Sequence, residues 1–175
     1  MKSISVSVIS GDIGRVKADA VVTAINSGGA WFGGVDGVIQ RYAGSLFHQQ
    51  AASALPLSHG KTVVAKGTIE NQASFSNVVF VIDDLEGKLS DIVYAGLVAS
   101  SEAGFAEVTL PTIRMGVMLG VVEKTPSEAV NEMVQGISRF IGTYSSHTSI
   151  KKITIVIFNG HHIQELFEKH FEKQP

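Results

Sequence analysis

The sequence contains no cysteine among its 175 residues, so disulfides, thiolate metal sites and cysteine nucleophiles are excluded. It also lacks a long basic run, and its formal net charge is −2. Nucleic-acid binding depends on clustered positive charge, so we expect no nucleic-acid partner. Backbone amides could still hold a small anion without any basic side chain.

Long apolar runs are missing as well. No stretch approaches the roughly 20 apolar residues that span a bilayer, so we expect no membrane association. The opening residues, MKSISVSVIS, alternate polar and apolar side chains, which predicts a strand and not a signal peptide. The histidines, including the pair His161-His162, lack a metal-ligand spacing such as H-E-x-x-H, so we expect no metal and no cofactor. These observations favour an intracellular, cytoplasmic protein.

Short apolar segments alternate with helical patterns along the whole chain. The predicted strands are the alternation around Ile4, Val6 and Val8, then Ala20–Ile25, Thr62–Val64, Val78–Ile82, Glu107–Leu110 and Ile153–Phe158. The predicted helices are Val35–Phe47, Ser90–Ala103, Pro126 to about Ile141, and Ile163–Phe171. This order predicts an α/β fold with a mostly parallel sheet covered on both faces, in a single domain over residues 1–175.

Ligands of such sheets bind beyond the carboxyl ends of the strands. The loops to consider are therefore Gly11–Val16, Asn26–Gly37, Ile113–Gly120 and the segment after Phe158. The second of these loops reads NSGGAWFGGVDG and leads directly into a predicted helix near Gly34. Glycines allow close approach of the backbone, and a helix N-terminus attracts phosphate, so the loop is suited to a phosphate or diphosphate. It matches neither the dinucleotide fingerprint nor a P-loop, and a flexible surface loop stays open as the alternative.

Single polar residues in these loops have ordinary structural interpretations too. Asp36 could be a first-turn acid favoured by the helix dipole, and Asn26 could bond its own backbone in a turn. Arg114 could pair with phosphate or be exposed to solvent, the commoner outcome. The acidic pair Asp83-Asp84 is best explained by a turn at the end of a strand.

Taken together, the motifs resemble the macro domain family. The matching segments, in order, are Gly11-Asp12-Ile13, Ala18-Asp19-Ala20-Val21-Val22, Asn26, Gly33-Gly34-Val35-Asp36-Gly37, Arg41-Tyr42-Ala43-Gly44, Pro111-Thr112-Ile113 with Gly116 and Gly120, and Ile157-Phe158-Asn159. The ten-residue step from Asn26 to Asp36 equals the family's step between the corresponding Asn and Asp. The resemblance implies a three-layer α/β/α sandwich with a mixed, mostly parallel central sheet that binds ADP-ribose or an ADP-ribosylated substrate.

The resemblance also implies roles for individual residues. Asp12 would accept a hydrogen bond from the adenine amino group, the Ile13 amide would contact a ring nitrogen, and Phe158 would pack near the adenine or its ribose. The diphosphate would lie between the amides of two loops, formed by Gly33, Gly34 and Val35 and by Gly116, Val117 and Met118. Asn26 would bond the distal ribose, and Asp36 would help to position the water in members that hydrolyse the ADP-ribosyl linkage.

The chain departs from the family pattern at several of these places. Trp31 and Phe32 replace glycines of the first loop, Arg114-Met115 replaces Ser-Thr of the second, and Gln40 stands where a histidine is common. We expect Trp31, Phe32 and Arg114 to reshape the pocket of a divergent member. Three functions stay open: an ADP-ribosyl hydrolase using Asn26 and Asp36, a non-catalytic ADP-ribose or nucleotide reader, and an interaction module whose pocket its own aromatics occlude.

Overall fold

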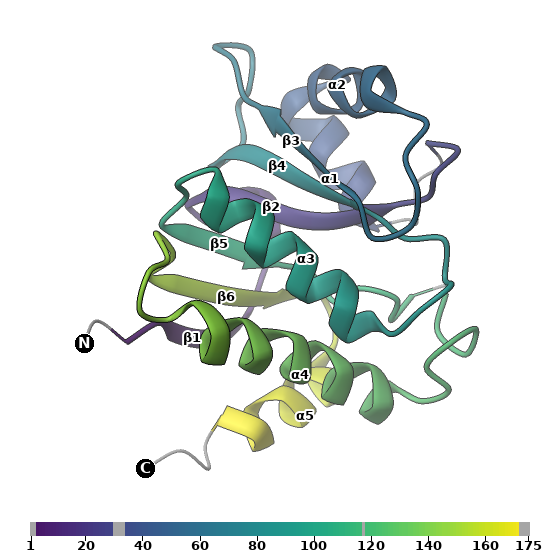
Figure 1. The fold of residues 1–175 in the computed structure, drawn as a ribbon, viewed down its shortest axis with the longest axis vertical. Helices are drawn as coiled ribbons and strands as arrows, with labels where there is room; N and C mark the ends of the chain where they lie inside the picture. Colours follow the sequence, from purple (N-terminus) through teal and green to yellow (C-terminus); the bar gives the residue numbers. More distant parts are fainter. Residues whose placement is uncertain (1–2, 30–33, 117, 172–175) are drawn as a thin grey trace.

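The computed structural model describes residues 3–29, 34–116 and 118–171. Within them, a six-stranded sheet in the order β1-β6-β5-β2-β4-β3 forms the centre, and helices cover both of its faces (Figure 1). Neighbouring strands are parallel except for β3 and β4, which are antiparallel. The strands are β1 (Ser5–Ser10), β2 (Ala18–Ile25), β3 (Thr62–Lys66), β4 (Phe75–Ile82), β5 (Glu107–Leu110) and β6 (Lys152–Ile157). The predicted three-layer α/β/α class, with a mixed and mostly parallel sheet, is confirmed.

The almost wholly apolar sequence of β2 follows from its place inside the sheet. Every residue of β2 except Asp19 is buried, as expected for a strand covered on both faces. The carboxylate of Asp19 accepts hydrogen bonds from the amides of Ala106 and Glu107, at 2.7 and 2.8 Å. Asp19, the one charged residue of β2, thus ties the start of this strand to the start of its neighbour β5.

The helices divide between the two faces. On one face lie α3 (Leu89–Glu102) and α4 (Pro126–Tyr144), with α5 (His161–Phe171) beside α4 and β1, and the opposite face is covered by α1 (Gly34–Ala43) and α2 (Leu46–Ala54) (Figure 1). The longest of them, α4, is capped at its N-terminus by Thr125, whose hydroxyl accepts from the Glu128 amide, and Pro126 occupies the first turn. None of the described helices is both long and apolar enough to cross a membrane.

The single helix predicted over Val35–Phe47 is wrong, because the structure divides this segment into α1 and α2. Gly44 ends α1 with a φ of 61°, a conformation that glycine adopts readily, and its amide donates to the Gln40 carbonyl at 2.9 Å. Apolar spacing continues through the break, so periodicity alone could not reveal it. The break redirects the chain and places His48, on α2, against α1.

Candidate ligand-binding site

A cavity of about 490 Å³ lies beyond the carboxyl ends of the parallel strands, a volume typical of small-molecule sites. The β1 end contributes Asp12 and Ile13, and the start of α1 contributes Gly34, Val35 and Asp36. The loop after β5 and the segment after β6 complete the wall with Pro111–Gly116, Met118 and Phe158–Gly160. Four segments that lie far apart in the sequence are thus brought to one cavity, as expected for this kind of sheet.

Asp12 is held by two hydrogen bonds at the β1 end of the cavity. Its Oδ1 accepts from the Gly14 amide at 2.9 Å, which starts a short 3-10 helix at Ile13–Arg15. Its Oδ2 accepts from the Tyr42 hydroxyl on α1, also at 2.9 Å, and the hydroxyl itself accepts from Arg15 Nε at 3.1 Å. Each carboxylate oxygen has a second lone pair, so Asp12 keeps acceptor capacity for a ligand.

Asp36 lies in the first turn of α1 and contacts a histidine that the sequence did not point to. His48 Nε2 is 2.5 Å from Asp36 Oδ1, and the exposed fractions of the two side chains are 9% and 23%. Burial lowers the pKa of His48 below its ordinary value, although the Asp36 carboxylate acts in the opposite direction. The imidazole is therefore neutral at pH 7, and the tautomer protonated on Nε2 would donate to Asp36.

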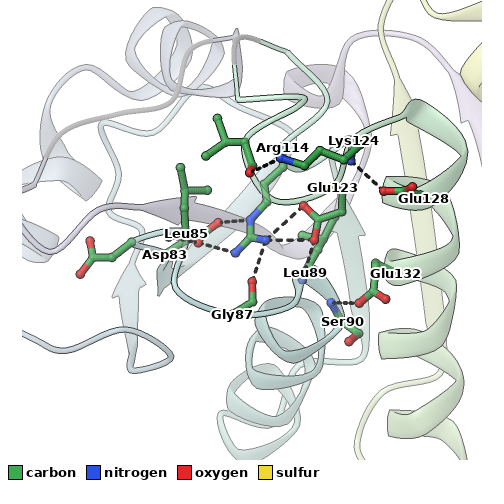
Figure 2. Close-up of polar contacts among 12 residues, drawn as sticks. Asp83, Leu85, Gly87, Leu89, Ser90, Arg114, Glu123, Lys124, Glu128 and Glu132 are labelled. Atoms are coloured by element: carbon green, nitrogen blue, oxygen red, sulfur yellow. Dashed lines mark hydrogen bonds and ion pairs between the residues drawn. The ribbon is translucent and has the colours of Figure 1, made fainter.

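Arg114 matches neither of the alternatives considered from the sequence. Its side chain is 1% exposed and pairs with Asp83 and Glu123, so it is neither solvated nor directed at a ligand (Figure 2). Arg114 borders the cavity, and its guanidinium is turned into the protein. The strand-end turn expected at Asp83-Asp84 is present, with the Leu85 amide donating to Asp83 Oδ1 at 3.0 Å.

Most of the residues implied by the sequence line the cavity. They are Asp12, Ile13, Gly34, Val35, Asp36, Arg114, Gly116, Met118 and Phe158, the last with its side chain at the surface. Asn26 follows β2 but is not among the described lining residues. Trp31, Phe32, Gly33 and Val117 lie outside the described residues. The described part of the chain has no group of three or more His, Asp or Glu residues arranged to hold a metal ion.

Sequence reasoning missed Tyr42 and His48. Tyr42 falls at helical spacing with its apolar neighbours, which predicts a place on the core side of a helix. The ring packs against Gly14, where an added Cβ would clash with the Tyr42 ring carbons. The one indication in the sequence that His48 could approach α1 is Gly44. A glycine there can end one helix and change the direction of the next, which carries His48.

No family profile matches the chain. A curated macro domain-containing protein of Streptomyces coelicolor is 26% identical over 165 residues, which cover 89% of this chain and 92% of that protein. Among solved structures, the Trypanosoma brucei macrodomain in complex with ADP-ribose superposes with a TM-score of 0.76 at 19% identity, covering 95% of this chain and 68% of that one. A variant of the Oceanobacillus iheyensis macrodomain with ADPR gives a TM-score of 0.68 at 15% identity, covering 94% and 90%.

The chain has the macrodomain fold. The resemblance drawn from its motifs is thereby confirmed, and the low identities agree with a divergent member. Of the departures from the family pattern, Arg114 and Met115 lie in the loop after β5 and line the cavity. Arg114, which replaces a small polar residue of the family pattern, is one of the most buried charged residues described in this chain.

Proposed function

We propose that the cavity binds ADP-ribose or a closely related ADP-ribosyl compound. The observation that carries this proposal is the convergence of Asp12, the N-terminus of α1 and the loop after β5 on one cavity. An adenine needs a hydrogen-bond acceptor such as Asp12 beside apolar surface. A diphosphate is stabilised by a helix N-terminus, where free amides and the helix dipole favour negative charge.

The binding proposal is tested by calorimetric titration with ADP-ribose, for which we expect micromolar affinity, about −8 kcal/mol. The Asp12→Ala variant should lose most of this affinity. Asp91→Ala, at an exposed acid on α3, should retain it, since Asp91 pairs with the exposed Arg139 on α4, and both helices cover the face of the sheet opposite α1. A flat titration of the wild-type protein would contradict the proposal and favour an interaction module with an occluded pocket.

We further propose that the bound ADP-ribosyl linkage is hydrolysed with the help of Asp36. Asp36 lines the cavity, and its carboxylate has one oxygen against His48. A neutral His48 donating to Oδ1 would leave Oδ2 to accept a hydrogen bond from a water molecule. The water could then attack the anomeric carbon as the bond to the leaving group breaks, with oxocarbenium character in the transition state.

The hydrolysis proposal is tested with a mono-ADP-ribosylated protein as substrate. Asp36→Asn keeps the shape of the side chain but removes its charge, and should lower turnover by about 10²–10⁴-fold with little change in ADP-ribose affinity. Unchanged turnover in this variant would contradict the role of Asp36. Binding without turnover in the wild-type protein would support the alternative, a non-catalytic reader, which the position of Asn26 outside the described cavity lining favours.

A further inference from the structure

The segment between β4 and α3, residues 83–88, contacts two of the loops that border the cavity, the one after β2 and the one after β5. On the side of the first loop, the Asp83 amide donates to the Ile25 carbonyl at 2.7 Å, and Asp84 Oδ1 accepts from the Ser27 amide at 2.8 Å. The Ser27 hydrogen bond lowers the pKa of Asp84 below its ordinary value. The Asp84 carboxylate therefore stays charged and fixes the chain directly after β2.

On the side of the second loop, the same segment holds Arg114, and all three nitrogens of its guanidinium donate hydrogen bonds. Nε and Nη2 donate to the two oxygens of Asp83, at 2.9 and 2.7 Å. Nη1 donates to the Gly87 carbonyl at 2.9 Å and to Glu123 at 3.1 and 3.2 Å. Figure 2 shows the guanidinium between the two carboxylates, with Glu123 also facing the start of α3. Its Oε1 accepts from the Leu89 amide at 3.1 Å.

This Arg114 cluster (Arg114, Asp83 and Glu123) is buried, with side-chain exposures of 1%, 0% and 4%. Burial opposes the charged form of Arg114, but the two carboxylates outweigh it and raise its pKa above the ordinary value. One guanidinium against two carboxylates leaves no positive charge to attract a phosphate. Arg114 would therefore contribute to an anion site by fixing the shape of the loop and not by attracting the anion with its charge.

The backbone conformation of Arg114 also indicates a structural role for this residue. Its φ is 60°, in the left-handed region that side chains other than glycine, asparagine and aspartate rarely adopt. Such a conformation persists only where surrounding contacts fix it, and it is commonest at functional sites. Arg114 adopts it at the cavity wall, two residues before Gly116, and the bidentate pair with Asp83 supplies the compensating contacts.

We propose that Arg114 is a positioning residue, which holds the loop after β5 in the conformation that receives the diphosphate of the ligand. The inference rests on the proposed binding of ADP-ribose. It gives a role to two features that the function alone left unexplained, the acidic pair Asp83-Asp84 and an arginine where the family pattern has a small residue. Arg114 acts through the loop backbone and makes no contact with the ligand itself.

Two variants test this role with the whole chain. Arg114→Lys keeps the charge but loses the planar fork, and Glu123→Gln removes one charge while leaving the bidentate Asp83 pair in place. The measurements are affinity for ADP-ribose, affinity for adenosine, which lacks the diphosphate, and amide hydrogen exchange of residues 113–116 and 118–120. Arg139→Lys is the matched control, since its pair with Asp91 is exposed and lies away from the cavity.

We expect both variants to lower ADP-ribose affinity by about tenfold, the lower end of the losses seen when residues that support metal ligands are mutated. Adenosine affinity should be unchanged. Exchange of the loop amides should accelerate in both variants and not in the control. Unchanged affinity and exchange, or an equal loss for adenosine, would overturn the inference. If the wild-type protein binds no ADP-ribose, the proposed function fails, and the exchange comparison still decides whether Arg114 holds the loop.

Discussion

Two walls of the cavity contain charged side chains, one formed by α1 and the other by the loop after β5. The two walls differ in how far these side chains are buried and in how many hydrogen bonds they make. On the α1 wall, Asp36 is partly exposed and has one short contact, with His48. On the other wall, Arg114 is buried and makes hydrogen bonds to two carboxylates and a carbonyl. Asp36 therefore keeps acceptor capacity toward the cavity, whereas every nitrogen of the Arg114 guanidinium bonds to the protein.

The largest loss of stability is expected at Arg114, on the wall formed by the loop after β5. Arg114→Met would leave Asp83 and Glu123 buried without a cation, which should lower the free energy of unfolding by about 3–5 kcal/mol. Urea unfolding followed by circular dichroism measures the loss. The matched Arg139→Met variant, at an exposed pair, should lose no more than about 1 kcal/mol. Equal losses at the two positions would remove the distinction between the buried cluster and a surface pair.

A smaller loss of stability is expected where Tyr42 of α1 contacts Asp12, which follows β1. Tyr42→Phe removes the hydroxyl that donates to Asp12 and keeps the ring that packs on Gly14, so unfolding free energy should fall by about 0.5–1.5 kcal/mol. In an Asp12→Asn background, the same substitution should cost less, because its charged acceptor is gone. Additive losses in this double-mutant cycle would show that the hydroxyl and Asp12 are not coupled.

The smallest effect is a pH dependence of stability that originates in His48. Its pKa is lowered in the folded state, so the unfolded chain binds more protons between that pKa and about 6.5, the ordinary histidine value. The stabilisation is complete above pH 6.5 and is lost as the pH falls through the lowered pKa. The urea midpoint of the wild-type protein should therefore fall more between pH 7.5 and 5.0 than that of His48→Gln. Parallel pH profiles would assign the dependence to other groups.

Much of the fold follows from local sequence. The uniformly apolar segment Ala20–Ile25 predicts a strand covered on both faces, and β2 is that strand. Gly104, after the predicted helix at Ser90–Ala103, has a φ of 84° and follows α3 as a C-terminal glycine does. The order of the glycine-bearing loops after the strands predicted where a cavity would lie, because parallel strands bring their carboxyl ends to one edge.

The arrangement within the site was less accessible from the sequence. Nothing in the sequence around His48 relates it to Asp36, since their contact depends on the direction in which α2 leaves Gly44. Arg114 and Asp83 are 31 positions apart, and Arg114 and Glu123 are separated by a loop. An arginine is usually exposed to solvent, whereas Arg114 is buried. Whether a side chain is buried depends on how the whole chain packs, which the local sequence does not show.

The sequence by itself determined the α/β architecture, the macro domain resemblance and the loops that border the cavity, because periodicity, glycine positions and motif order are local properties of the chain. Only the tertiary structure decided which charged groups face the cavity and which are turned into the protein. Pairing energies of charges depend on distance and burial, and both are fixed only when strands and helices from distant parts of the chain come together.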